Sequence, residues 1–310
     1  MTLSNRPGAS RRLPGAAGRL DACLGRLRRG PGDPTHRRVG EVWWRSCWTP
    51  EGSALLQLRD DGDDVALRAW GEGAEWALDQ APRLLGCHDE GRLETSHPVL
   101  RELVHRFPRL RVGATDLVCE SLLPSVVEQK VTGAEAFRAI HRLTRRLGEP
   151  APGPAGTRGH PAEGMRLPLR PAQWAGIASW DYLKAGVDQR RATTLVGAAR
   201  RSRALERTLT SSDADAALRS LPGIGPWTSA RTRQQAHGDP DAWSIGDYHV
   251  PRQISLALCG EELDDDDCAE LLEPFAGQRY RVELLVLLGG PRRERRGPRR
   301  SLPTHLPTRW

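Results

Sequence analysis

Lysine is almost absent from this chain of 310 residues, which contains only Lys130 and Lys184. Arginine therefore supplies nearly all of the positive charge, and the formal net charge is +7. An excess of this sign favours an anionic partner such as nucleic acid. It is weak evidence alone, because many basic chains bind no polyanion.

The six cysteines include no CxxC pair, so their spacing indicates neither a zinc site nor an iron–sulfur cluster. We therefore expect no metal and no cofactor. No apolar run approaches the roughly twenty residues that a membrane-spanning helix needs, and the arginine-rich N-terminus lacks an apolar signal core. These absences predict a reduced, intracellular protein with no membrane partner, located in the cytoplasm near the nucleoid.

The N-terminal part changes character near residue 40. Residues 1–39 are rich in Arg, Gly and Pro, which predicts a mostly disordered basic segment with one short helix near residues 20–27. Residues 40–95 contain short alternating apolar runs, VWWRSCW, SALLQLRDD, DVALRAW and AEWALD. They predict a small β-rich domain with an antiparallel sheet. Half of the ten tryptophans lie here; core packing is the favoured interpretation, and lining a nucleobase pocket is the alternative.

From residue 96 onward the apolar residues recur at helical spacing, and residues 96–290 predict a helical domain. HPVLRELVHRF predicts one helix, and two more meet near Thr132 and Gly133. The acidic run ELDDDDCAELLEPF is expected to face away from a nucleic acid. Residues 291–310 are basic and proline-rich, which predicts a disordered tail.

Residues 212–249 combine a short helix, a glycine turn, a second helix and a loop that leads to Asp247. Gly223 and Gly225 supply backbone freedom for the turn, and Pro226 suits the first position of the second helix. Free N–H groups at such a helix start favour a phosphate. A plain helical corner without a ligand is the alternative interpretation.

Three pieces of this stretch, LPGIGPWTSA, GDPDAW and DYHVPRQ, resemble the helix-hairpin-helix DNA glycosylase superfamily, most closely its 3-methyladenine-DNA glycosylase II branch. In that family an aspartate follows the hairpin tryptophan at the spacing that separates Trp227 from Asp247 here. SVVEQKVTG and LKAGVDQRRATTL are similar to two further motifs of the superfamily. The resemblance covers residues 96–290 well and 41–95 more loosely. It implies a mainly α fold, with a helix-hairpin-helix glycosylase core and a small N-terminal antiparallel β domain.

The resemblance also implies roles for single residues. Asp247 would be the catalytic carboxylate that stabilises positive charge on the sugar as the glycosidic bond breaks; capping the next helix is a compatible role. Trp227 and Gln129 would line the pocket for the flipped base, with core packing or a solvated helix face as alternatives. The DNA backbone would be contacted by Gly223, Ile224, Gly225, Thr228 and Lys130. Asp239 and Asp241 are explained by the GDPD turn.

Relatives that also cut the DNA backbone use a lysine where this chain has Trp227, so the resemblance implies a monofunctional enzyme. Arg231 stands where alkylation-repair relatives have an aromatic residue, which leaves the lesion open. We expect a monomer that acts on double-stranded DNA containing a damaged, 3-methyladenine-like base. The alternatives are the same fold acting on oxidised or deaminated bases, and a non-catalytic helix-hairpin-helix DNA-binding protein. Asp247 argues against the last.

Overall fold

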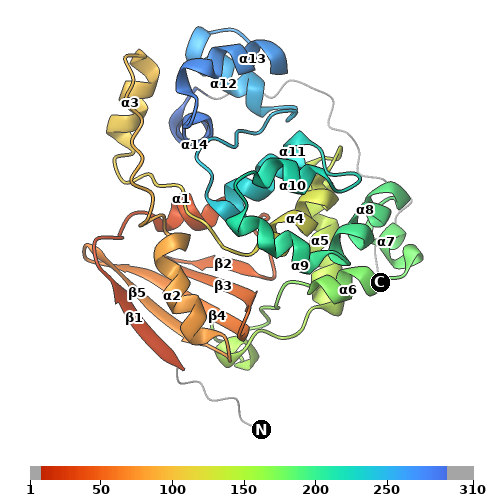
Figure 1. The fold of residues 1–310 in the computed structure, drawn as a ribbon. Helices are drawn as coiled ribbons and strands as arrows, with labels where there is room; N and C mark the ends of the chain where they lie inside the picture. The colour runs from red at the N-terminus through yellow and green to blue at the C-terminus, as the bar shows by residue number, and fades with distance from the viewer. Residues whose placement is uncertain (1–7, 292–310) are drawn as a thin grey trace.

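One antiparallel sheet of five strands occupies the N-terminal part of the computed structural model, which describes residues 8–291 (Figure 1). The strands are β1 (Ala9–Leu13), β2 (His36–Val39), β3 (Val42–Thr49), β4 (Gly52–Asp61) and β5 (Asp64–Trp70). Their order is β1-β5-β4-β3-β2, so β2 to β5 form a meander and β1 is added beside β5. This confirms the small antiparallel sheet that the alternating runs predicted.

The prediction of disorder for residues 1–39 is wrong for residues 8–39. Both edge strands, β1 and β2, come from this segment, and α1 (Leu20–Gly25) lies between them where a short helix was predicted. Strand β1 is rich in arginine, but Arg12 pairs with Asp64 at 2.6 Å. An edge strand is held by backbone hydrogen bonds to one neighbour, which require no apolar pattern. Residues 1–7 lie outside the described residues, as does the predicted tail beyond residue 291.

Helix α2 (Ala74–Leu84) forms where AEWALD was grouped with the strands, so that assignment is wrong. Its buried residues recur at helical spacing: Ala74, Ala77, Leu78, Ala81 and Leu84. Six residues were too few for the sequence to separate this period from strand alternation. The helix contacts β1, β4 and β5 and covers one face of the sheet (Figure 1).

Tryptophans of the sheet pack mainly in the interior. Trp43, Trp44 and Trp70 are buried, and the rings of Trp44 and Trp70 stack with their centroids 5.8 Å apart. Trp48 and Trp76 are half-buried. These positions support core packing, the favoured interpretation of the tryptophan-rich segment.

The rest of the described chain is mainly helical, which confirms the mainly α fold class. The α-helices are α3 (Pro98–Arg106), α4 (Val118–Glu128), α5 (Gly133–Leu147), α6 (Pro171–Gly176), α7 (Ser179–Ala185), α8 (Gln189–Ala199), α9 (Ser202–Glu206), α10 (Ala214–Arg219), α11 (Pro226–Thr232), α12 (Val250–Cys259), α13 (Asp265–Leu272) and α14 (Arg279–Gly289). Short 3₁₀ turns are η1 (Gly153–Gly156), η2 (Arg207–Thr210) and η4 (Glu273–Phe275). A π-helical turn, η3 (Arg233–His237), continues α11.

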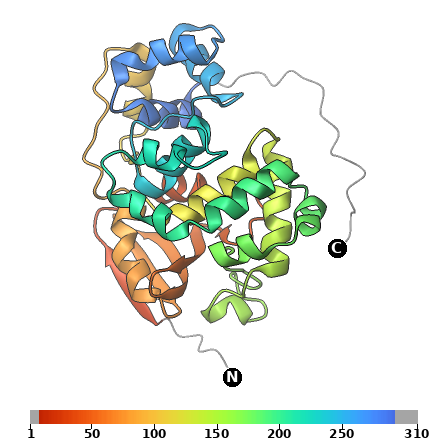
Figure 2. The same ribbon diagram turned by 45° about the vertical axis from the view of Figure 1, so that its right-hand side comes forward.

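The helices pack around two apolar centres that flank the hairpin. Buried α4 contacts α5, α8 and α11, whereas α14 contacts α3 and α12. Figure 2 shows α12 to α14 at the top, the sheet at the bottom, and the hairpin helices between them. Within residues 8–291, no helix is both long and apolar enough to cross a bilayer.

Candidate active site

The turn between α10 and α11 depends on the backbone of Gly223. Its φ is +86°, and a Cβ at this position would lie 2.3 Å from Thr194 Oγ1. Gly225 differs, because its φ is −97° and an added Cβ would meet no atom within 4 Å. Of the two glycines predicted to free the turn, Gly223 is therefore the one that its backbone conformation requires.

Gln129, which follows α4, braces this turn. Its Nε2 donates to the carbonyl oxygen of Gly223 at 3.0 Å and to Thr228 Oγ1 at 2.9 Å. The side chains of Thr228 and Ile224 are buried, so a phosphate at this turn would meet main-chain N–H groups rather than these side chains. Lys130 is exposed next to Gln129 and has a positive φ of 56°. The amide nitrogen of Gln129 is thus committed to the hairpin in this structure.

Trp227 and Asp247 meet across the loop that separates α11 from α12. The indole Nε1 of Trp227 donates to Asp247 Oδ2 at 3.0 Å. The other oxygen, Oδ1, accepts from the N–H groups of His249 at 2.8 Å and Val250 at 3.1 Å, where α12 begins. The half-buried carboxylate is therefore held from both sides: Asp247 accepts from Trp227 on one side and, on the other, from the N–H groups of His249, the N-cap of α12, and of Val250, its first residue.

Asp239 and Asp241 lie in the loop of residues 238–249, here called the Asp247 loop, and each has an arginine partner outside it. Asp239 pairs with Arg233 at 2.5 Å, and Asp241 pairs with Arg279 on α14. Asp241 also accepts from the N–H of Gly277 at 2.8 Å. These contacts agree with the structural explanation of both aspartates.

The acidic run, which forms α13 and the residues beside it, contacts the Asp247 loop at one point; that the run faces away from a nucleic acid stays a prediction. Asp264 caps α13 by accepting from the N–H groups of Asp266 and Asp267. Asp265 Oδ1 accepts from the N–H of Gly246 at 3.0 Å, immediately before Asp247. One acidic residue of the run therefore braces the Asp247 loop from α13.

Two side chains close in sequence to Trp227 and Asp247 are also defined. Arg231 lies one helical turn after Trp227 on α11, on the same face. It is half-buried, and its Nη1 donates to Gln234 Oε1 at 3.1 Å. Tyr248, which follows Asp247, is 67% exposed. Sequence reasoning assigned no role to this exposed ring, although its place beside Asp247 was a usable signal.

A buried carboxylate behind the loop, Glu283 on α14, was also missed. It is 1% exposed and accepts two hydrogen bonds from Ser244 in the Asp247 loop. Burial raises the pKa of Glu283 to about 7, and the negative charge of Asp247 adds to this effect. The available signal was a single acidic residue inside the apolar run RYRVELLVLLGG.

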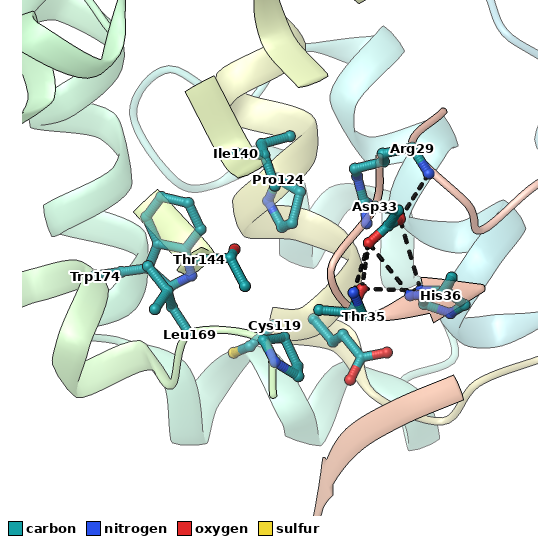
Figure 3. Close-up of a pocket in the computed structure, with 12 residues that line it drawn as sticks. Arg29, Asp33, Thr35, His36, Cys119, Pro124, Ile140, Thr144, Leu169 and Trp174 are labelled. Carbon is teal, nitrogen blue, oxygen red and sulfur yellow. Dashed lines mark hydrogen bonds and ion pairs between the residues drawn. The ribbon is translucent and has the colours of Figure 1, made fainter. Parts of the chain in front are cut away.

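A small cavity of about 20 Å³ lies elsewhere, where the sheet meets α4, α5 and the segment before α6 (Figure 3). Its wall includes Asp33, which accepts from the N–H groups of Arg29 at 2.7 Å and Thr35 at 2.8 Å. Burial raises the pKa of Glu120, another lining residue. The volume suits about one water molecule, and neither Asp247 nor Trp227 lines it. Among residues 8–291, no group of three or more His, Cys, Asp or Glu side chains is placed to hold a metal ion.

No protein-family model and no curated protein matches this chain, but solved structures share its fold. The 3-methyladenine DNA glycosylase from Archaeoglobus fulgidus matches with a TM-score of 0.71 at 18% identity, over 90% of this chain and 97% of that one. An 8-oxoguanine glycosylase/lyase from Clostridium acetobutylicum, solved with double-stranded DNA, matches with a TM-score of 0.65 at 12% identity, over 86% of this chain and 89% of that one. At these sequence identities, the comparison shows a shared fold. The chain has the DNA glycosylase fold that its motifs predicted.

Proposed function

We propose that this protein is a monofunctional DNA glycosylase of base excision repair. It would flip a damaged base out of double-stranded DNA and hydrolyse the N-glycosidic bond. The observation that carries the proposal is the Asp247 carboxylate, held by the Trp227 indole and the start of α12 one loop away from a glycine hairpin. The shared fold with two DNA glycosylases supports it.

The reaction needs a negative charge close to the sugar. As the glycosidic bond breaks, the sugar acquires oxocarbenium-like positive charge, and a fixed carboxylate stabilises that charge without reorganising. Asp247 supplies the carboxylate, and it also orients the attacking water. The turn at Gly223 and the exposed Lys130 hold the DNA backbone, which positions the duplex without reading its sequence.

The residues of α11 support loss of the base without strand cleavage. Strand cleavage by this fold requires an amine that forms an imine with the sugar. Helix α11 contains no lysine, and Trp227 stands at the relevant position. Of the two similar solved structures, one is named a glycosylase and the other a glycosylase/lyase, so the fold alone does not decide whether strand cleavage occurs. Borohydride trapping of an enzyme–DNA adduct would contradict the monofunctional assignment.

The expected substrate is an alkylated purine similar to 3-methyladenine. Such bases are cationic, and the ring of Trp227 attracts a cation through its face. Arg231 favours a second candidate, an oxidised or deaminated base. Its guanidinium repels a cationic base, whereas it donates hydrogen bonds to a carbonyl oxygen.

The decisive experiment uses duplexes that each carry one defined lesion: an alkylated purine, an oxidised purine or a deaminated base. Abasic-site formation is measured in single turnovers with the wild type and Asp247→Asn. Asparagine keeps an oxygen for the N–H groups of α12 but removes the charge, so we expect base release to fall by on the order of 10²- to 10³-fold. Duplex affinity should stay nearly unchanged.

Asp213→Asn is the control, because Asp213 also caps a helix, α10, through the N–H of Ala216. It should release the base at the wild-type rate. Equal loss of base release and duplex binding in Asp247→Asn would assign that residue a structural role only. A monomeric state and a cytoplasmic, nucleoid-associated location are further parts of the proposal; light scattering and fractionation test them.

A further inference from the structure

Glu283 is a buried carboxylate whose hydrogen-bond partner lies in the Asp247 loop. It lies on α14 among apolar side chains and is 1% exposed. Among residues 8–291, no basic side chain forms an ion pair with it. A carboxylate in such a place is costly unless hydrogen bonds compensate. Its position inside an apolar helix therefore calls for an explanation beyond packing.

Both oxygens of Glu283 are directed at one residue of the Asp247 loop. Ser244 donates its N–H to Oε2 at 2.7 Å and its hydroxyl to Oε1 at 2.7 Å. The carbonyl oxygen of Ser244 in turn accepts from the N–H of Asp247 at 3.2 Å. A continuous series of hydrogen bonds therefore runs from α14 through Ser244 to the backbone of Asp247.

The same serine is tied to the helix that carries Trp227. Gln234, in the π-helical turn after α11, donates to Ser244 Oγ at 2.9 Å and to the carbonyl oxygen of Ala242 at 2.7 Å. Gln234 also accepts from Arg231 on α11. Ser244 thus joins α14, the end of α11 and the Asp247 loop, and π-helical turns of this kind often occur at functional sites.

We propose that Glu283 is a positioning residue for Asp247: as a carboxylate it accepts both hydrogen bonds of Ser244 and so holds the turn that presents the Asp247 side chain. The inference rests on the proposed function, in which Asp247 acts on the sugar. A carboxylate accepts at both oxygens, whereas a protonated glutamate or a glutamine must donate with one end. Either change therefore disturbs the pairing with Ser244, whose hydroxyl already accepts from Gln234.

The surroundings of Glu283 make this contact sensitive to pH near neutrality. Burial raises the pKa of Glu283 to about 7, with the charge of Asp247 acting in the same direction. The hydrogen bonds from Ser244 and the charge of Arg231 on α11 oppose the rise. Titratable Cys268 on α13 and Tyr280 on α14 also interact with Glu283. Leu100 and Leu103 of α3 and Ile254 and Ala257 of α12 belong to the apolar cluster around Glu283, and Ser255 is the polar side chain that α12 buries. The ionised fraction, and with it the hold on Ser244, therefore grows as the pH rises through about 7.

The test compares single-turnover base release by the wild type, Glu283→Gln and the control Glu270→Gln from about one pH unit below to one above the Glu283 pKa of about 7. Glu270 is exposed on α13. We expect the wild-type and Glu270→Gln rates to rise with pH through about 7. Glu283→Gln should lack this inflection and release the base on the order of 10- to 100-fold more slowly at the upper pH, as a displaced catalytic group does. Its duplex affinity should match the wild type, because the substitution leaves the hairpin intact.

A second measurement separates failure of this inference from failure of the proposed function. Hydrogen exchange at one fixed alkaline pH should be faster in peptides spanning the Asp247 loop of Glu283→Gln than in the wild type, with equal exchange in α4 and α5. Unchanged exchange in that loop would overturn the positioning role even if no substrate is found. If the wild type releases a base and Asp247→Asn does not, an unaltered rate and pH profile in Glu283→Gln would refute the inference while the proposed function stands.

Discussion

Replacing Gly223 with alanine tests the hairpin turn in stability and in DNA binding. The φ of +86° lies in the left-handed region, where an L residue with a Cβ costs about 1–2 kcal/mol. The new Cβ would also lie 2.3 Å from Thr194 Oγ1 and 2.8 Å from its Cγ2. Thr194 cannot rotate freely, because its hydroxyl donates to the carbonyl oxygen of Arg190 at 3.2 Å. Overpacking of this kind costs about 1–3 kcal/mol.

Together these terms predict that Gly223→Ala lowers the free energy of unfolding by about 2–5 kcal/mol. Displacement of the turn would also break the contact of its carbonyl oxygen with Gln129. If one hydrogen bond to a phosphate is lost, worth about 1.5–3 kcal/mol, the affinity for an undamaged duplex falls by about 10- to 100-fold. Denaturant unfolding measures the first quantity, and fluorescence anisotropy with a labelled duplex measures the second.

Gly225→Ala is the matched control, because its φ is −97° and an added Cβ meets nothing within 4 Å. It should unfold at the wild-type denaturant concentration. The double variant Gly223→Ala with Thr194→Ala should recover the steric part of the loss, because the two closest contacts disappear, and retain the backbone part of about 1–2 kcal/mol. Equal stability and equal duplex affinity of the two glycine variants would refute the reasoning.

Three further outcomes are expected. Trp227→Phe removes the indole donor to Asp247. Because a hydrogen bond to a charged group is worth about 1.5–3 kcal/mol, base release in single turnovers should fall by about 10- to 100-fold. An unchanged rate would show that this hydrogen bond is dispensable. The folded-state pKa of Glu283 is raised from 4.5 to about 7. Protonated Glu283 therefore stabilises the folded state at low pH, and this stabilisation is lost as the pH rises through that interval. The unfolding free energy of the wild type relative to Glu283→Gln should therefore decline by on the order of 3 kcal/mol across the interval, and parallel curves would contradict the raised pKa. Duplex affinity should fall steeply as the salt concentration rises. If Lys130 contacts a phosphate, Lys130→Ala should reduce the slope of log affinity against log salt by about 1. A slope identical to that of the wild type would show that Lys130 does not contact the DNA.

Predictions from the sequence succeeded where neighbouring residues decide the structure. The turn at Gly223, the start of α11 at Pro226 and the junction before α5 all depend on residues a few positions apart. The family resemblance added the pair Trp227 and Asp247, and the structure brings their side chains together at 3.0 Å. Their roles in base removal stay predictions until they are measured.

The failures have two physical causes. Strand β1 looked disordered because its composition is polar, but edge pairing with β5 and ion pairs such as Arg12–Asp64 order it. AEWALD was too short to show its helical period. The contact of Asp265 with the N–H of Gly246 was not predicted, because it depends on the packing of α13. The contacts that order β1 and bring Asp265 to the Asp247 loop are distant in sequence, whereas α2 was missed because its segment was too short.

The sequence by itself determined the helices of the hairpin, the glycine turn and the aspartate that precedes α12, because backbone preference and capping act within about one helical turn. Only the tertiary structure decided which side chains support that aspartate. Gln129 reaches the hairpin across 94 residues, and Glu283 reaches Ser244 across 39. The sequence does not show what a buried carboxylate does, because its pKa and its hydrogen bonds depend on the donors and charges that packing places around it.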